Sequence, residues 1–272
     1  MRNDQLYYTI NDASYWYEIH GEGTPVLMLH GFTGSISTWS NFVSNWKSEW
    51  QFIIIDLPGH GKTVTSTPRS METFCLEMKQ FLEYLNETPV HLVGYSMGGR
   101  TALSLAMLHP ELIKSLVLES ASPGLAYKDE RKCRREHDDN LARRIMDEGM
   151  ESFIDFWENI SLFSTQKNLP LEKKQSVRDE RLAQSEEGLA QSLRYMGTGS
   201  QPSWWKNLSQ FTKPVLLVTG ELDEKFTEIN KRMKKQLSLA EFVICENAGH
   251  AIHVEKPEIF GKLVTEFISM NK

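Results

Sequence analysis

The chain is poor in the residues that build disulfide-linked, metal-binding or membrane-spanning proteins. It has three cysteines among 272 residues, and Cys75, Cys133 and Cys245 lie far apart. That spacing predicts neither a disulfide framework nor a zinc site. Ordinary thiols in a reducing compartment are the simplest interpretation. No apolar run approaches the roughly 20 residues that a membrane-spanning helix needs, so we expect no membrane partner.

Positive net charge and a targeting segment are also missing. The formal net charge is −6, which argues against nucleic acid as a general partner. Residues 1–5 are polar and lack the apolar core of a signal peptide. We therefore expect a cytoplasmic protein, either a monomer or a weak homo-oligomer. There is no metal-ligand, nucleotide or flavin motif, so we predict no metal and no cofactor. The sequence also contains no internal repeat.

What the sequence does contain is an alternation of short apolar runs and helical stripes. Hydrophobic residues make up 40% of the chain, enough for one large α/β core. An alternating pattern predicts two antiparallel strands at 7–10 and 13–20. Continuous apolar runs, typical of strands buried on both faces of a parallel sheet, follow at 25–29, 52–55, 90–93, 116–118, 214–219 and 241–244. Helices are predicted at 39–46, 73–85 and 257–270.

The pattern changes between residues 125 and 208, where only charged amphipathic segments occur. Helices are predicted there at 138–148 and 150–158, with two more between 171 and 193. This organisation predicts a mostly parallel sheet with helices on both faces and an inserted helical cap. The expected division is a first core part at 1–122, a cap at 123–208 and a second core part at 209–272.

The stretch that organises the chain is residues 93–100, Val-Gly-Tyr-Ser-Met-Gly-Gly-Arg. It reads G-x-S-x-G between an apolar run and a helix-favouring run, the strand–turn–helix context of a nucleophile elbow. Gly94 and Gly98 allow the strand and the helix to approach closely, and Ser96 is presented at the tip. By itself the motif is common, and a plain Gly-rich turn is the alternative.

An early loop is the first of three features that support an active serine. His30-Gly31-Phe32-Thr33-Gly34 follows a predicted strand. In acyl-transfer enzymes of this architecture such a loop supplies one backbone N–H to an oxyanion, and the residue after the nucleophile supplies another. Those donors are Phe32 and Met97. Backbone donors need no particular side chain, so an ordinary glycine-containing loop stays possible.

A carboxylate and a histidine complete the set. Asp223 follows the strand at 214–219 and is placed to orient an imidazole, although an Asx-type turn is the alternative. His250 follows the strand at 241–244 after a glycine that permits a tight loop, and His253 is its nearest rival. Ser96, Asp223 and His250 occur in the chain order nucleophile, acid, histidine of an α/β hydrolase.

At this point the chain resembles the α/β-hydrolase fold over essentially its whole length. More narrowly, it resembles the 2-succinyl-6-hydroxy-2,4-cyclohexadiene-1-carboxylate synthases of menaquinone biosynthesis. The stretches that carry the narrower resemblance are 30–35 with Trp39, 94–100, 122–125 followed by Glu130, Arg131 and Arg134, 155–157, 196–203, 223–226, and 248–250 with His253.

The resemblance implies a carbon–oxygen lyase that eliminates pyruvate from a small polycarboxylate ring compound. Arg100, one helical turn after Ser96, suits that substrate because a guanidinium binds a carboxylate through two hydrogen bonds. An esterase for neutral esters gains nothing from it. The resemblance also implies two cap arginines on substrate carboxylates. Motif order favours Arg134 and Arg181, and Arg131 and Arg178 remain alternatives. Solvated helix faces, or an i,i+4 pair of Glu130 with Arg134, are the simpler interpretations.

Three aromatic residues join the expected substrate site. The hydroxyl of Tyr95 is expected to bond a carboxylate or a developing enolate. Trp157 and Phe163 are expected to wall the ring, with cap core as an equal alternative. The implied mechanism has Asp223 fix His250, which takes the proton of Ser96, and Ser96 then acts as the base. A carboxylesterase or carbon–carbon bond hydrolase with the same triad is the competing hypothesis.

Overall fold

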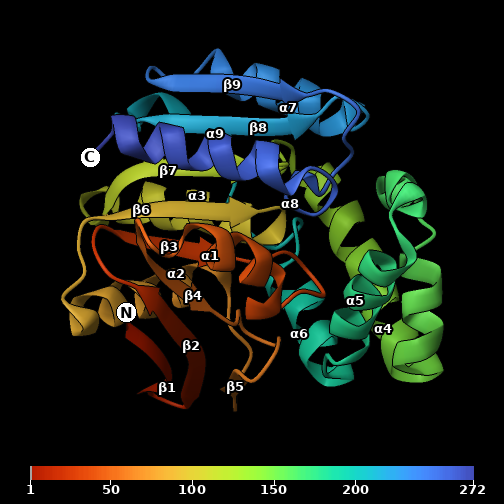
Figure 1. Ribbon diagram of the computed structural model, residues 1–272. Coiled ribbons are helices and arrows are strands. Elements are labelled where there is room, and N and C mark those ends of the chain that lie inside the picture. Colours follow the sequence, from red (N-terminus) through yellow and green to blue (C-terminus); the bar gives the residue numbers. More distant parts are fainter. Residues whose placement is uncertain (1) are drawn as a thin grey trace.

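The computed structural model describes residues 2–272 and contains one mixed sheet (Figure 1). Its strand order is β1-β2-β4-β3-β6-β7-β8-β9, and β5 pairs with β2 off this path. The strands are β1 Arg2–Ile10, β2 Ala13–Gly21, β3 Pro25–Leu29, β4 Gln51–Ile55, β5 Val64–Thr65, β6 Val90–Tyr95, β7 Ile113–Glu119, β8 Val215–Gly220 and β9 Ala240–Cys245.

Most of the sheet is parallel, as the continuous apolar runs predict. Every neighbouring pair among β3, β4, β6, β7, β8 and β9 is parallel, whereas β2 runs antiparallel to both β1 and β4. All residues of β4, β6 and β8 are buried. Burial on both faces requires covering helices, because an exposed apolar strand face would lose its hydrophobic stabilisation.

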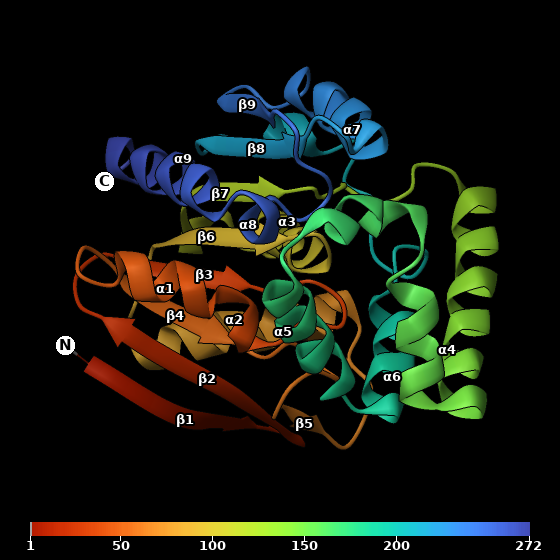
Figure 2. The same cartoon turned by 45° about the vertical axis from the view of Figure 1, so that its right-hand side comes forward.

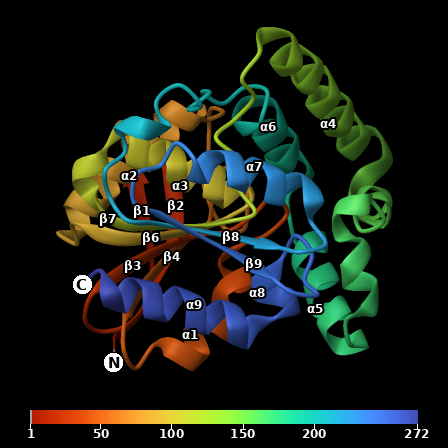
Figure 3. The same ribbon diagram turned by 90° about the horizontal axis from the view of Figure 1, so that it is seen from above.

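Helices cover both faces of the sheet. Viewed from above, α2, α3 and α7 lie on one face and α1, α8 and α9 on the other (Figure 3). The core helices are α1 Ser40–Trp46, α2 Met71–Leu85, α3 Met97–Leu108, α7 Glu224–Lys234, α8 Ile252–Glu255 and α9 Pro257–Met270, with 3₁₀ turns η1 Ile36–Trp39, η2 Pro110–Leu112 and η4 Leu208–Gln210. Two buried clusters, one on each face, form the core.

A group of helices between β7 and β8 stands beside the strand ends (Figure 2). Its elements are α4 Lys128–Trp157, η3 Ser161–Asn168, α5 Leu171–Leu182 and α6 Glu186–Met196. We call residues 128–196 the helical cap. A separate apolar cluster that includes Leu141, Phe153 and Leu189 holds α4 and α6 together.

The sequence prediction of a helix at 138–148 is wrong about where that helix starts. Helix α4 begins ten residues earlier, at Lys128, and runs to Trp157 with one non-helical residue, Gly149 (φ 84°). Residues 128–137 are almost all charged or polar and carry no apolar stripe, so periodicity does not reveal them. A hydrogen bond from the backbone N–H of Tyr127 to the carboxylate of Glu130 caps the start.

Candidate active site

Ser96 lies between β6 and α3 in a backbone conformation that few non-glycine residues adopt. Its φ is 51° and its ψ is −105°, so the turn is strained and the hydroxyl is held at the tip. The approach of strand and helix leaves no space for larger neighbours. A Cβ on Gly94 would lie 2.5 Å from the carbonyl oxygen of Gly98. The backbone N–H of Ser96 donates to the carbonyl of Glu119 at 2.9 Å, which ties the turn to β7.

The structure brings Ser96, His250 and Asp223 together across 154 residues of sequence. His250 Nε2 lies 2.9 Å from Ser96 Oγ, and Nδ1 lies 2.6 Å from Asp223 Oδ2. His250 is 1% exposed and Asp223 is 7% exposed. The carboxylate accepts the Nδ1–H, which leaves Nε2 free to accept the serine proton. Phe226 packs against the imidazole with ring centroids 4.7 Å apart.

The neighbouring acids serve other purposes, in agreement with the choice of Asp223. Glu221 accepts the backbone N–H of Asn247 at 3.0 Å. Asp223 itself is the N-cap of α7, where its second oxygen accepts the N–H of Phe226 at 3.4 Å. A carboxylate that both caps a helix and holds an imidazole has little freedom to rotate. The triad geometry is therefore fixed from both sides.

The loop after β3 lies opposite the elbow and is shaped by two buried histidines that the sequence did not single out. His30 Nε2 accepts the N–H of Leu57 at 3.0 Å, and His60 Nε2 lies 3.3 Å from the N–H of Thr33. Burial lowers the pKa of His60 to about 4 and that of His30 well below its ordinary value. Both rings are thus neutral acceptors at neutral pH, and they hold the backbone of the loop that contains Phe32.

The other expected oxyanion donor is Met97, the first residue of α3. A first-turn N–H has no acceptor within its own helix, so it is available to a ligand. Phe32 presents its ring to the cap, 5.4 Å from Trp157. Sequence reasoning missed His30 and His60 because a buried histidine that bonds to backbone leaves no spacing pattern.

Arg100 carries a half-buried guanidinium whose partners are neutral. Its Nη1 donates to the carbonyl of Met196 at 3.0 Å and to the side-chain oxygen of Gln201. In the described part of the chain no carboxylate forms an ion pair with it. Burial, followed by repulsion from Arg134, lowers the pKa of Arg100 to about 9, so it stays charged at neutral pH. A desolvated cation with neutral partners is a binding site for an anion.

Of the four cap arginines considered, the structure separates Arg181 from Arg178. Arg181 is 7% exposed. Its guanidinium lies 4.7 Å from the Phe163 ring centroid, Nη2 donates to Gln166 at 3.1 Å, and Nη1 forms one long ion pair with Glu158 at 3.7 Å. Arg178 instead forms ion pairs with Asp155 at 2.7 Å and Glu158 at 2.8 Å. A guanidinium already bound to two carboxylates is a poor candidate for a third.

Arg134 lies near enough to Arg100 to lower its pKa, so two cations share this side of the site. Its partner is Asp138, at 2.7 Å on the next turn of α4. Glu130, the alternative partner, caps the helix instead. Arg131 is half-buried at the start of α4. Arg134 therefore stays a prediction as a substrate-binding residue.

Two of the three expected aromatic residues, Tyr95 and Phe163, pack against the triad histidine, and Trp157 packs against Phe163. Tyr95 is 8% exposed and packs 5.5 Å from His250. Burial, with a contribution from Glu119, raises the pKa of Tyr95 well above its ordinary value, so its hydroxyl keeps its proton. Phe163 packs 6.1 Å from His250 and 5.8 Å from Trp157. The indole N–H of Trp157 is enclosed and has no partner among the described residues, as is also true of Trp16, Trp39 and Trp50.

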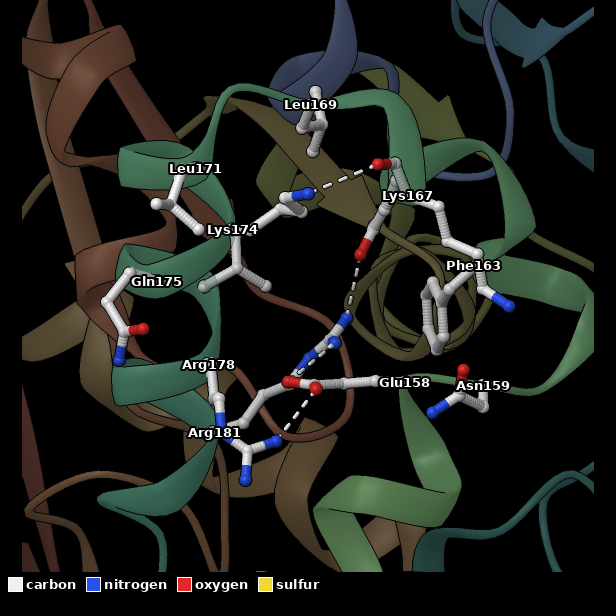
Figure 4. Close-up of a pocket in the computed structure, with 12 residues that line it drawn as sticks. Glu158, Asn159, Phe163, Lys167, Leu169, Leu171, Lys174, Gln175, Arg178 and Arg181 are labelled. Atoms are coloured by element: carbon white, nitrogen blue, oxygen red, sulfur yellow. Dashed lines mark hydrogen bonds and ion pairs between the residues drawn. The ribbon is translucent and has the colours of Figure 1, made fainter.

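Two cavities meet at Arg181 and Phe163. One, of about 280 Å³, lies within the cap and is lined by Glu158, Lys174 and Arg178 (Figure 4). The other, of about 510 Å³, lies between the cap and the core and also reaches Tyr95 and Phe32. Within residues 2–272 no three His, Cys, Asp or Glu side chains are grouped to hold a metal ion. The same residues contain no helix long and apolar enough to cross a bilayer.

Comparison with known proteins identifies the family. Residues 24–257 match the family model described as the alpha/beta hydrolase fold. A Bacillus subtilis (strain 168) protein, provisionally named 2-succinyl-6-hydroxy-2,4-cyclohexadiene-1-carboxylate synthase, is 42% identical over 90% of this chain and 90% of its own length. The chain belongs to this synthase family of the α/β-hydrolase fold. The synthase from Photorhabdus laumondii subsp. laumondii is 30% identical, covering 90% of this chain and 85% of its own.

Solved structures agree on the fold and separate the synthase family from its more distant neighbours. MenH from S. aureus superimposes with a TM-score of 0.90 at 32% identity, covering 94% of this chain and 98% of its own. An enol-lactonase from Burkholderia xenovorans LB400 reaches 0.84 at only 18% identity, covering 97% of this chain and 99% of its own. The second likeness extends to the fold alone. The predicted fold class is thereby confirmed.

Proposed function

We propose that this chain is a carbon–oxygen lyase of menaquinone biosynthesis. It eliminates pyruvate from 2-succinyl-5-enolpyruvyl-6-hydroxy-3-cyclohexene-1-carboxylate to give 2-succinyl-6-hydroxy-2,4-cyclohexadiene-1-carboxylate. The 42% identity with the Bacillus subtilis protein over 90% of the chain supports this reaction. The observation that carries it at the site is Arg100, a desolvated cation one helical turn from Ser96 that forms no ion pair with a carboxylate in residues 2–272, with Asp138 acting on it only at longer range.

The triad acts as a relay that makes an alkoxide-like base. His250, oriented by Asp223 at 2.6 Å, takes the proton from Ser96 at 2.9 Å. The serine oxygen then removes the proton from the carbon alpha to the succinyl ketone. The released electron pair forms a double bond between ring carbons 2 and 3, the existing double bond moves from carbons 3 and 4 to carbons 4 and 5, and the bond from carbon 5 to the enolpyruvyl oxygen breaks. The leaving enolate takes up a proton and departs as pyruvate, so no acyl-enzyme forms.

Charge placement supports proton abstraction at carbon. Removing a proton alpha to a ketone places negative charge on the ketone oxygen, and backbone donors stabilise such charge without reorganising. In this proposal Phe32 and Met97 supply those donors. Arg100, Arg134 and Arg181 bind the carboxylates, and their charge offsets that of the substrate. Holding the C–H against Ser96 converts binding energy into a favourable reacting geometry.

The aromatic residues complete the substrate site in this proposal. Trp157 and Phe163 pack against the ring of the substrate. The Tyr95 hydroxyl remains protonated because burial raises its pKa, and it donates a hydrogen bond to a carboxylate or to the developing enolate.

A paired assay tests the proposed reaction. The purified chain is given the enolpyruvyl substrate, and pyruvate formation is followed by reduction with lactate dehydrogenase. The same enzyme is then given p-nitrophenyl acetate and butyrate. We expect rapid pyruvate release and slow ester hydrolysis. Rapid ester hydrolysis with no pyruvate release would instead establish the carboxylesterase alternative.

A further inference from the structure

A second buried acid–imidazole pair lies directly behind Tyr95. Both oxygens of Glu119, at the end of β7, lie within 2.9 Å of His253 Nδ1 on α8. The backbone N–H of His253 also donates to Glu119, at 3.0 Å. Glu119 is 0% exposed and His253 is 8% exposed. The backbone carbonyl of Glu119 also accepts the N–H of Ser96. The pair is therefore attached directly to the nucleophile turn.

The ring of His253 is held in one orientation. Tyr95 packs against it edge-on with ring centroids 4.5 Å apart, and Trp39 packs at 5.0 Å. Phe260 packs at 6.0 Å. Nδ1 is bonded to Glu119, and the second nitrogen, Nε2, has no hydrogen-bond partner among the described residues. Nε2 is also not fully enclosed by protein atoms, so a ligand can reach it. A buried polar atom is normally hydrogen-bonded, so this free nitrogen is a candidate ligand-binding atom.

The cavity of about 510 Å³ supplies the place for that ligand. His253 and Tyr95 line it from the core, and Arg181 and Lys173 line it from the cap. Arg181 is partly offset by Glu180 and by Glu158, whose carboxylate lies 3.7 Å from its Nη1. Glu180 is occupied by three donors from Ser35 and Thr38, and Glu172 is exposed to solvent. Cations and a nitrogen donor facing one cavity suit a carboxylate.

We infer that His253 is a further substrate-binding residue, whose Nε2 donates a hydrogen bond to one carboxylate of the substrate in the cavity behind Tyr95. Glu119 fixes the ring through Nδ1, and the hydrogen bond from Nε2 to a carboxylate uses the doubly protonated ring, which donates from both nitrogens. Arg100 and Arg134 lie in the other part of the site, where Met196 and Gln201 are found. The two groups of cations then hold carboxylates at separate ends of the substrate. This inference rests on the proposed lyase function.

Two isosteric substitutions separate binding from structure. His253→Asn keeps an amide nitrogen near the position of Nδ1, so the bond to Glu119 survives while the cavity donor is lost. His253→Gln places its nitrogen near the position of Nε2 and leaves Glu119 with only the backbone N–H of residue 253. We expect His253→Asn to raise KM for the enolpyruvyl substrate about 10- to 100-fold, the effect of one hydrogen bond to a charged group. Its kcat and thermal midpoint should stay near those of the wild type.

His253→Gln should show the reverse, a lower thermal midpoint with a KM closer to that of the wild type. Inhibition by pyruvate and by succinate, measured on wild type and His253→Asn, identifies the carboxylate, since only the inhibitor that occupies this cavity should weaken. Wild-type KM in His253→Asn, or KM changes that follow stability in both variants, would overturn the inference. Pyruvate release by the wild type tests the proposed function separately.

Discussion

Arg100 is the side chain whose chemistry distinguishes this site from that of an enzyme acting on neutral esters. It projects from the first turn of α3 toward Gln201 and Met196. Burial costs a cation several kcal/mol unless an anion compensates it. The hydrogen-bond partners of Arg100 are neutral, and Asp138 attracts it only at longer range. In the proposed function, a substrate carboxylate supplies the remaining compensation.

We predict that Arg100→Ala lowers kcat/KM for the enolpyruvyl substrate by about 100-fold or more, since a charge-assisted hydrogen bond contributes about 1.5–3 kcal/mol and each 1.4 kcal/mol is tenfold. The thermal midpoint should change little, because removing an uncompensated buried charge offsets the lost contacts. Arg143→Ala, which removes an exposed arginine paired with Asp139, is the matched control. An unchanged kcat/KM in Arg100→Ala would remove this residue from the site.

The buried histidine of the oxyanion loop gives a pH prediction. The pKa of His60 is about 4 in the folded chain against about 6.5 when unfolded. The unfolded state therefore binds more protons between pH 4 and 6.5. The stabilisation is present above pH 6.5 and is lost as the pH falls toward 4. His60→Gln should reduce the slope of unfolding free energy against pH in this window.

Urea denaturation at several pH values between 4.5 and 7 measures that slope. One group contributes at most about 1.4 kcal/mol per pH unit. Asp56, whose pKa burial raises to about 6, acts in the opposite direction, so the difference between variant and wild type is the relevant quantity. Substitution of the exposed His137 by Gln should leave the slope unchanged. Equal slopes for His60→Gln and wild type would show that His60 is not a buried neutral base.

The site residues that sequence predicted best are those fixed by backbone position. Ser96, Asp223 and His250 each follow a strand in the parallel sheet, and parallel strands end at one edge. Their meeting point follows from the strand order. His253 was considered only as a rival to His250. Its pairing with Glu119 is invisible in the sequence because the two residues are 134 positions apart and no spacing connects them.

At the scale of elements, helix α5 connects the cap to the oxyanion loop. Glu180 accepts the backbone N–H of Ser35 at 2.9 Å and the hydroxyls of Ser35 and Thr38, both at 2.8 Å. One helical turn on, Gln184 accepts the N–H of Gly61 at 2.9 Å. On α5, between these residues, lies Arg181. The position of Arg181, a proposed substrate-binding residue, therefore depends on these contacts.

We predict that Glu180→Ala loosens α5 and raises KM several-fold with a smaller effect on kcat. The half-buried N–H of Ser35 loses its acceptor, which costs about 1–3 kcal/mol. Hydrogen exchange of residues 171–182 measures the loosening. Asp179→Ala, on the exposed neighbouring position, is the control. If α5 exchanges equally in both variants, Glu180 does not anchor the cap.

Helices and strands could be predicted where buried apolar residues recur with a regular spacing. They could not be predicted where charged residues hide that spacing. The strands and α9 follow directly from apolar runs and stripes. The start of α4 and the whole of α7 do not, because both are rich in charged residues and the stability of α7 comes from its Asp223 cap and its packing on β8. The two-residue strand β5 exists only by pairing with β2. Its sequence alone carries no signal.

At the scale of the whole molecule, the core sheet carries the catalytic triad, and the helices beside it carry residues that are proposed to bind the substrate. The triad comes from strand ends of the core, and Arg134, Trp157, Phe163 and Arg181 come from the cap. A shared α/β-hydrolase scaffold thus supports an elimination when the groups around the serine bind carboxylates. Fold likeness by itself does not distinguish these reactions.

The most direct test of this account is the rate of pyruvate release by Ser96→Ala. The exposed Ser209→Ala serves as the matched control, and near-native thermal midpoints in both variants establish that folding is intact. Loss of the general base should lower kcat by about 10³- to 10⁴-fold, while the arginines still bind the substrate and KM changes little. Pyruvate release at the wild-type rate by Ser96→Ala would contradict the account, because the serine would then take no part in removing the proton.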